Sequence, residues 1–214
     1  MFDRRKLAQA WDHTHQEKPT SEQPNVEVVA FADCLRRQLS PGAPVLDAGC
    51  GRGRNVFCLS QAGFVVYACD LSPVAISVVK ARAQRIDATA SFQIADLAYM
   101  PYPGNFFAAV VCVHVLPYHY KAGIARVVRE LRRVLRPGGW LYFDLLGCDD
   151  AEYGCGQELE QHTFLDPDGV PIHSSSRQEV DELLDGFAVE RASRFELGSL
   201  ARTRVGWVVW ARKR

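Results

Sequence analysis

Apolar and polar stretches alternate along the chain in a way that predicts alternating strands and helices. The clearest helix has apolar residues at the i, i+3, i+4 and i+7 spacing from Ile124 to Leu135, and Pro137, Gly138 and Gly139 follow it. Phe64 to Cys69 is almost continuously apolar, which is typical of a strand that is buried on both faces. Strands that alternate with helices favour a parallel sheet with helices on both faces.

The same patterns give the order of the elements. We expect helices over 1–16, 25–39, 54–62, 73–86, 124–135 and 177–185, and strands over 44–48, 64–69, 90–95, 106–113, 140–146, 187–195 and 203–212. The last two strands form a hairpin, so the last strand is antiparallel to the others. The segment 147–175 has little periodicity and many Gly, Pro, Asp and His residues, and a stretch of that kind is typical of a lid or a binding loop. The fold class is therefore α/β, with a seven-stranded, mostly parallel sheet.

Composition narrows the class of protein further. The chain has 214 residues with 48% hydrophobic content, and its 25 basic and 25 acidic residues give a formal net charge of zero. This balance provides no electrostatic reason to expect nucleic acid or an anionic membrane as a partner. We expect no signal peptide, and the sequence has no apolar run of about 18 residues as in a membrane span and no C-x-x-C pattern among its seven cysteines. Free thiols in a reducing cytoplasm are the expectation.

A glycine-rich turn follows the first predicted strand. Gly49, Gly51 and Gly53 alternate directly after Asp47. Glycine tolerates positive φ and has no Cβ, so such a turn lets a ligand lie against the backbone. The amides of the turn and the start of the next helix can donate hydrogen bonds to a negatively charged group.

Acidic residues stand at the ends of the first three strands, where open α/β sheets bind ligands. Asp47 ends the first strand, Asp70 the second, and Asp96 comes just after the third. Asp70 lies 21 residues after Gly49, a distance at which an acidic residue meets a ribose in dinucleotide-type sites. Asp96 is suited to accept a hydrogen bond from an exocyclic amine such as that of adenine.

Together these motifs resemble those of the class I S-adenosylmethionine-dependent methyltransferases. The resemblance covers about 40–212 and adds an Arg-Pro-Gly-Gly motif before the fifth strand. It implies a Rossmann-like fold, S-adenosyl-L-methionine as cofactor and S-adenosyl-L-homocysteine as product. Within the class, Gly-Cys-Gly-Arg-Gly-Arg-Asn and the final Trp-Val-Val-Trp-Ala-Arg-Lys-Arg are similar to tellurite-resistance-type and other small-molecule methyltransferases.

The resemblance also implies which residues hold each part of the cofactor. The methionine part would lie against the glycine turn and the end of the fourth strand, the ribose against the second strand, and the adenine after the third. The N-terminal helix would cover the site. The methionine part is assigned to Asp47, Gly49, Gly51 and Val113, and the ribose to Asp70 and Leu71. The adenine is assigned to Asp96 and Leu97, and the cover to Trp11.

The acceptor side is less specific in sequence. His114, Tyr118 and His119 follow the fourth strand, and they either form a pocket wall or include a general base, because histidine titrates near neutral pH. No Asn-Pro-Pro-Tyr motif follows that strand, which argues against the amino-group methyltransferases of nucleic acids and of protein glutamine. Residues for substrate selection are expected in the segment 147–175, and the candidates are Glu160, His162 and His173.

These observations predict a small-molecule methyltransferase. An N-terminal helical segment (1–40) would cover the cofactor, and the domain itself (41–214) would include the capping segment 147–175. The expected partners are a small-molecule acceptor and, at most, a second copy of the chain; nucleic acid, membrane and metal are not expected. Two alternatives stay open, an NAD(P)-dependent oxidoreductase, which normally has Gly or Ala where this chain has Arg54, and a non-catalytic cofactor-binding module.

Overall fold

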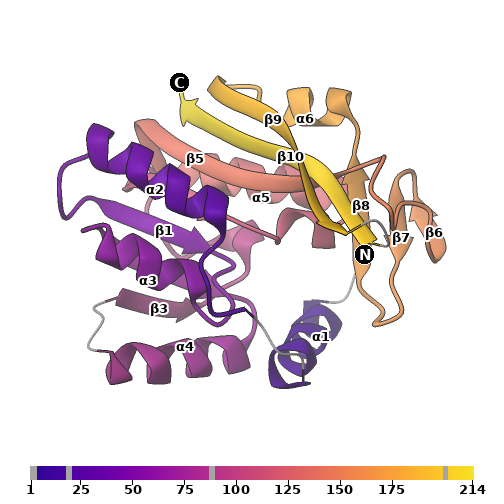
Figure 1. Cartoon of the computed structure of the whole chain (residues 1–214), viewed down its shortest axis with the longest axis horizontal. Helices are drawn as coiled ribbons and strands as arrows, with labels where there is room; N and C mark the ends of the chain where they lie inside the picture. Colours follow the sequence, from indigo (N-terminus) through magenta and orange to yellow (C-terminus); the bar gives the residue numbers. More distant parts are fainter. Residues whose placement is uncertain (1–3, 18–20, 87–89, 200–201) are drawn as a thin grey trace.

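Parallel strands form the centre of the sheet, in the order β3-β2-β1-β4-β5 (Figure 1). The computed structural model describes residues 4–17, 21–86, 90–199 and 202–214. The strands are β1 (Pro44–Ala48), β2 (Val65–Asp70), β3 (Ala90–Ile94), β4 (Phe107–Cys112), β5 (Leu135–Gly147), β9 (Phe187–Ser199) and β10 (Arg202–Lys213). β10 lies antiparallel between β5 and β9, so the predicted mostly parallel sheet with a reversed last strand is confirmed. The sheet has ten strands, three more than predicted, because three short strands of the segment 147–175, described below, extend it from β5.

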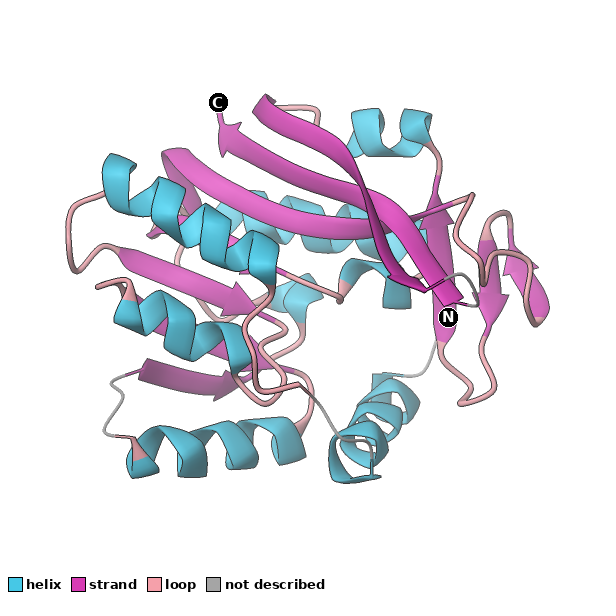
Figure 2. Ribbon diagram, in the orientation of Figure 1, coloured by secondary structure: helices cyan, strands magenta, loops and turns pink. Residues whose placement is uncertain are grey.

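Helices cover both faces of this sheet (Figure 2). They are α2 (Val26–Gln38), α3 (Arg54–Gln61) and α4 (Pro73–Arg85) on one face, and α5 (Lys121–Val134) and α6 (Arg177–Leu183) on the other. β4 is buried at every position, which explains its continuous apolar sequence. The sheet thus lies between two apolar cores, one on each face, and its most uniformly hydrophobic strands contact both.

Side-chain caps fix where several helices begin. Ser72 accepts a hydrogen bond from the amide of Ala75, with Pro73 as the first residue of α4, and Ser176 forms a capping box with Glu179 at the start of α6. The start of α4 directly follows Asp70 and Leu71 at the end of β2, which border the cavity described below. The fold thus positions that edge of the sheet through local sequence signals.

The segment 147–175 differs from the prediction. Its described residues form β6 (Gln157–Glu160), β7 (Thr163–Leu165) and β8 (Pro171–Ser175), an antiparallel meander that we call the β6–β8 arm. β8 pairs in parallel with the end of β5, with Leu146 opposite Ser174. The expectation of an irregular loop was wrong because strands this short, with mixed polar and apolar residues, leave no measurable periodicity.

The two helices of the N-terminal segment lie in different parts of the molecule. α2 packs on the sheet, where Phe31 contacts the rings of Trp140, Tyr142 and Trp210. The other helix, α1 (Arg4–Glu17), lies beside α4 and away from the sheet (Figure 2). Residues 1–3 of the predicted first helix lie outside the described residues.

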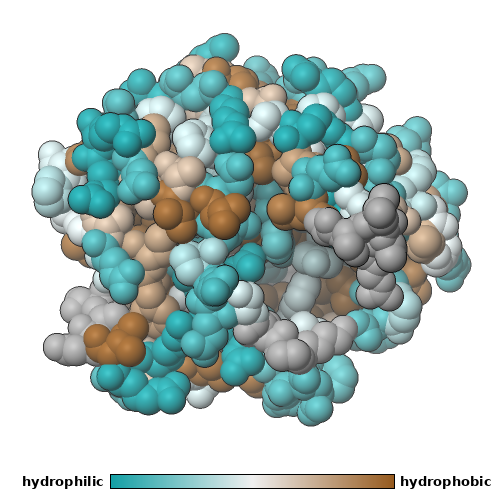
Figure 3. All heavy atoms as spheres, viewed as in Figure 1, coloured by the Kyte–Doolittle hydropathy of each residue, from teal (hydrophilic) through white to brown (hydrophobic). Residues whose placement is uncertain are grey.

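Within the described residues, no helix has the length and apolar character needed to cross a membrane. In the view of Figure 3, apolar residues are scattered among hydrophilic ones over the surface.

Candidate active site

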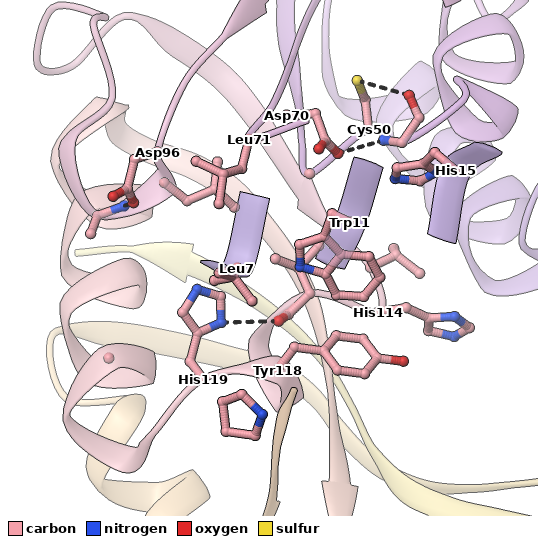
Figure 4. Close-up of a pocket in the computed structure, with 18 of the residues that line it drawn as sticks. Leu7, Trp11, His15, Cys50, Asp70, Leu71, Asp96, His114, Tyr118 and His119 are labelled. Atoms are coloured by element: carbon pink, nitrogen blue, oxygen red, sulfur yellow. Dashed lines mark hydrogen bonds between the residues drawn. The ribbon is translucent and has the colours of Figure 1, made fainter. Parts of the chain in front are cut away.

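A cavity of about 710 Å³ lies at the carboxyl ends of β1, β2 and β4. This is the point where the strand order reverses around β1, which is where ligands bind in open α/β sheets. Its wall comes from the glycine turn, the ends of β2 and β4, the short helix η1 (Leu97–Tyr99) and α1 (Figure 4). Of the residues predicted from sequence, it contains Trp11, Gly49, Gly51, Asp70, Leu71, Asp96, Leu97, Val113, His114, Tyr118, His119 and Glu160.

The glycine turn has the left-handed backbone that its sequence predicts. Gly49 and Gly51 have φ of +79° and +51°, and the amide of Gly49 donates a 2.8 Å hydrogen bond to the carbonyl of Cys69. A Cβ at Gly49 would lie 2.3 Å from Cγ2 of Val115. Glycine is therefore required at position 49 by a protein neighbour as well as by its backbone angle, which the sequence prediction, framed only in terms of a ligand, did not include.

Asp70 is held in place by backbone amides on both of its oxygens. Oδ2 accepts a 2.8 Å hydrogen bond from Gly51, and Oδ1 accepts a 2.9 Å bond from Ser72. Burial raises the pKa of Asp70, while these amide donors lower it. Each carboxylate oxygen has two acceptor positions, so one on each oxygen is left for a ligand. The side chain can accept hydrogen bonds from two neighbouring hydroxyl groups.

Asp96 and Leu97 border the other end of the cavity. The Oδ1 atom of Asp96 accepts a 2.8 Å hydrogen bond from the amide of Ala98 and so caps η1. Leu97 is buried, and the three residues 96–98 all contribute to the cavity wall. A carboxylate next to an apolar side chain is suited to a flat heterocycle that carries an amine.

Asp47 lies outside the cavity wall, in contrast to the other acidic residues at the strand ends. It is buried beneath the glycine turn, and its Oδ2 atom has no hydrogen-bond partner among the described residues. Burial raises its pKa to about 7; the charge of Asp70 adds to this shift and Arg54 opposes it. A direct contact between Asp47 and a ligand is therefore not supported by its position.

α1 closes the cavity through residues at positions 7, 11 and 15, which share one face of the helix. The ring of Trp11 meets that of Tyr118 edge-on, with 4.8 Å between centroids. His15 lies over the glycine turn, 3.3 Å from where a Cβ of Gly51 would be, and burial lowers its pKa. We did not predict His15 as a site residue, although its spacing from Trp11 was a sufficient signal.

Asp12 ties α1 to the start of α4. Its Oδ1 atom accepts hydrogen bonds from the hydroxyl of Ser72 and, at 3.3 Å, from the amide of Val74. Ser72 is also the residue whose amide donates to Asp70. The covering helix and the acidic residue of β2 are therefore connected through one serine.

His114 has an unusual backbone and two charged neighbours. Its φ is +55°, and its amide donates a 2.7 Å hydrogen bond to Oδ1 of Asp144 on β5. Its ring nitrogen Nε2 lies 3.3 Å from Oδ2 of Asp144, and Nδ1 lies 3.3 Å from Nη2 of Arg54. Asp144 is buried, and burial raises its pKa while His114 lowers it. Asp144 was not identified from sequence.

His119 and Tyr118 are neutral parts of the wall. His119 Nδ1 lies 3.1 Å from the carbonyl oxygen of Val115, and burial lowers the pKa of the imidazole. In Figure 4 it lies on the opposite side of Tyr118 from His114. Burial also raises the pKa of Tyr118. The two predicted histidines are therefore in different parts of the cavity.

The substrate candidates from the segment 147–175 are separated by the fold. Glu160 is in the cavity wall, where its Oε1 atom accepts a 2.7 Å hydrogen bond from the amide of Lys121. His162 lies outside the wall, with Nδ1 2.7 Å from the hydroxyl of Tyr153. His173 is buried beside a second hollow of about 100 Å³, with Nδ1 2.8 Å from the hydroxyl of Thr163. Of these three predicted residues, Glu160 alone borders the large cavity.

The described residues contain no group of three or more His, Cys, Asp or Glu side chains arranged to hold a metal ion. All seven cysteines are free.

Comparison with known proteins finds a methyltransferase domain and relatives that share it. The methyltransferase domain matches residues 46–143. Curated relatives include the tRNA N(3)-cytidine methyltransferase METTL2 of Gallus gallus, 27% identical over 151 residues that cover 65% of this chain and 40% of the relative. The ubiquinone biosynthesis O-methyltransferase of Xanthomonas campestris pv. campestris is 30% identical over 146 residues, or 67% of this chain and 58% of the relative. The chain spans less than half the length of the METTL2 relatives that it matches.

Solved structures share the fold. Magnesium protoporphyrin IX methyltransferase from Synechocystis PCC 6803 with bound S-adenosylhomocysteine has a TM-score of 0.72 at 18% identity, covering 99% of this chain and all (100%) of that one. TehB from Haemophilus influenzae has a TM-score of 0.70 at 17% identity, covering 96% of this chain and 67% of that one. The chain therefore contains a methyltransferase domain and has the fold of S-adenosylmethionine-dependent methyltransferases.

Proposed function

We propose that this protein transfers a methyl group from S-adenosylmethionine to a small-molecule acceptor. The observation that carries the proposal is the contact between Gly51 and Asp70 at the cavity, since it joins a glycine turn to a carboxylate that is preorganised for two hydroxyl groups. Asp96 and Leu97 stand at the other end of the same cavity. These are the positions that the family motifs occupy in this sequence.

The residues of the cavity fit the cofactor part by part. Asp70 has one acceptor position left on each oxygen for the ribose hydroxyls, and charged acceptors of this kind form the stronger hydrogen bonds. Asp96 and Leu97 would hold the adenine, and the turn at Gly49 and Gly51 would hold the methionine part. His15 adds a buried imidazole above the turn, and its Nδ1 atom has no partner among the described residues.

The cofactor supplies an activated sulfonium methyl group when it is bound. The protein then has to hold the acceptor in line with that group and to exclude water, because positioning alone accounts for a large share of such a barrier. Trp11 and Tyr118 meet edge-on across the cavity and restrict access to it. Glu160 and Pro171, from the β6–β8 arm, border the space in which the acceptor would lie.

A small acceptor agrees with the shape and charge of the cavity. Its volume of about 710 Å³ is within the range of small-molecule sites, and α1 and the β6–β8 arm both contribute to its wall. The arginines of the wall, Arg52, Arg54 and Arg126, are balanced by Asp70, Asp96 and Glu160. The 30% identical relative is named for an O-methyltransferase of ubiquinone biosynthesis, which is also consistent with a small acceptor.

A tRNA acceptor is the second candidate, and it is favoured by the METTL2 relatives. These relatives give no support to the expectation that nucleic acid is excluded as a partner. We place tRNA second because the chain spans less than half of their length, and because its formal net charge of zero does not favour a phosphate backbone.

The test is a transfer assay with methyl-labelled S-adenosylmethionine and a panel of phenols, alcohols, carboxylates, amines, thiols and unmodified tRNA. We expect label in a small molecule, and about 10²-fold less of it with the Asp70→Ala variant at a subsaturating concentration of S-adenosylmethionine. Label in tRNA alone would overturn the small-molecule acceptor and favour the second candidate. Tight binding of S-adenosylhomocysteine without transfer to any member of the panel would favour a non-catalytic module.

A further inference from the structure

His114 is fixed by a buried carboxylate at two points. Asp144 accepts the hydrogen bond of the His114 amide with one oxygen and lies next to Nε2 of its ring with the other, at 2.7 and 3.3 Å. The φ of +55° at His114 is costly for a residue with a Cβ, and such backbone strain persists where the surrounding structure holds it. Asp144 is buried within β5, whereas the His114 side chain is 47% exposed and lies in the cavity wall.

The neighbours of the ring define its tautomer. The Arg54 guanidinium has donors only and is always charged, so Nδ1 of His114 has to be the acceptor of that contact. The ring proton is then on Nε2, which faces the carboxylate of Asp144. The lone pair of Nδ1 faces Nη2 of Arg54 in the cavity wall, so an acceptor hydroxyl has to replace Arg54 as the donor to Nδ1. With that exchange, the ring is a base oriented by a buried acid.

We propose that His114 is the general base for the methyl acceptor and that Asp144 positions it, and therefore that the acceptor is a small molecule with a protonated hydroxyl nucleophile, a phenol or an alcohol. This inference rests on the proposed methyl transfer. Thiolates and metalloid anions carry a free lone pair without losing a proton, so a protein specialised for them has no use for an oriented base. The Asp144 carboxylate stabilises the imidazolium that forms when Nδ1 takes up the proton.

A bond forms between the acceptor oxygen and the methyl carbon while the bond between that carbon and the sulfonium sulfur breaks, and its electron pair stays on sulfur. The hydroxyl has taken the place of Arg54 at Nδ1 of His114, and its proton passes to that nitrogen. The products are the methyl ether, a neutral thioether and an imidazolium paired with Asp144, and the imidazolium loses its proton to water before the next turnover.

His119 is a weaker candidate for this role. Its Nδ1 atom lies at hydrogen-bond distance from the carbonyl oxygen of Val115, which orients the ring but offers no full negative charge to an imidazolium. Burial lowers its pKa and so disfavours the protonated form. His119 fits better as a neutral wall residue near the Asp96 end of the cavity.

The experiment compares wild type with His114→Gln and Asp144→Asn, and uses Asp185→Asn, at an exposed loop position, as the matched control. With a phenol or alcohol acceptor, we expect both site variants to lose roughly 10²–10⁴-fold in kcat. KM and the affinity for S-adenosylhomocysteine should stay near wild type, and the control should be unchanged. With a thiol of low pKa, the same variants should lose less than about tenfold.

Nitrogen NMR of the His114 ring provides a readout that does not depend on turnover. The wild-type ring should carry its proton on Nε2, and Asp144→Asn should move it to Nδ1 because the amide group presents a donor to Nε2. Equal losses with hydroxyl and thiol acceptors, or a wild-type ring protonated on Nδ1, would overturn the base assignment. If wild type transfers methyl groups to no acceptor, the proposed function itself fails, which is distinguishable from failure of the base alone.

Discussion

The amide of Gly51 donates a 2.8 Å hydrogen bond to Oδ2 of Asp70, and this contact joins the turn after β1 to the end of β2. The amide of Ser72 binds the other oxygen at 2.9 Å. The carboxylate is therefore oriented by the backbone before any ligand arrives. A preorganised acceptor does not have to lose side-chain freedom on binding, which favours affinity.

Replacing Asp70 with Ala should weaken the binding of S-adenosylhomocysteine by about 3 kcal/mol, or about 10²-fold, because the ribose hydroxyls lose a charged acceptor. The amides of Gly51 and Ser72 also lose their partner, so the free energy of unfolding should fall by about 1–3 kcal/mol. Calorimetric titration and chemical denaturation measure the two effects. Asp185→Ala at an exposed position is the control, and an unchanged dissociation constant for Asp70→Ala would contradict the ribose assignment.

Substitution of Gly49 should be costly for two separable reasons. Gly49 and Gly169 have nearly equal φ, +79° and +78°, but a Cβ at Gly49 would lie 2.3 Å from Cγ2 of Val115, whereas a Cβ at Gly169 would have nothing within 4 Å. Gly169→Ala should lose about 1 kcal/mol of stability from the backbone alone. Gly49→Ala should lose at least about 1 kcal/mol more, from overpacking.

Chemical denaturation of the two glycine variants gives this difference directly. The double variant Gly49→Ala with Val115→Ala should recover part of the loss, since it removes the atom that a new Cβ would meet. Equal stability of the Gly49 and Gly169 variants would show that packing against Val115 does not require glycine.

Asp47 should make the folded state less stable as the pH rises. The pKa of Asp47 in the folded state is about 7, above the ordinary value of 3.8. Between these two pH values the folded state therefore keeps the Asp47 proton, whereas the unfolded state has lost it. The stabilisation is fully present below pH 3.8 and is lost as the pH rises through about 7. The full shift corresponds to about 4 kcal/mol.

The measurement is the free energy of unfolding of wild type and Asp47→Asn between pH 4.5 and pH 8, compared with Asp185→Asn. Relative to the neutral Asn variant, wild type should lose stability progressively over this range. A pH-independent difference between the two proteins would mean that Asp47 is ionised throughout and has a partner.

The contact of Asp12 with Ser72 and Val74 should control how firmly α1 covers the cavity. Asp12→Ala should loosen α1 by about 1 kcal/mol, the typical effect of losing a capping side chain. Amide hydrogen exchange in α1 and the dissociation rate of S-adenosylhomocysteine should each rise about fivefold. Glu17→Ala, an exposed change on the same helix, is the control, and unchanged exchange in α1 would contradict this role of Asp12.

The sequence predicted best those features of the structure that depend on residues close together in the chain. The buried strands, the cap at Ser72 and the positive φ at Gly49 and Gly51 are local, and the structure agrees with each. The β6–β8 arm was missed because its strands are too short to show a period. Asp144 was missed because 30 residues separate it from His114, and only the pairing of β4 with β5 brings them together.

The central claim is that the cavity at Gly51 and Asp70 binds S-adenosylmethionine and its product. Its most direct test is calorimetric titration of the wild-type chain and of Asp70→Ala with S-adenosylhomocysteine, with NADH as the competing dinucleotide. We expect one site per chain for S-adenosylhomocysteine, binding about 10²-fold weaker in Asp70→Ala, and no comparable binding of NADH. Preferential binding of NADH, or equal affinity of both proteins for S-adenosylhomocysteine, would contradict this claim.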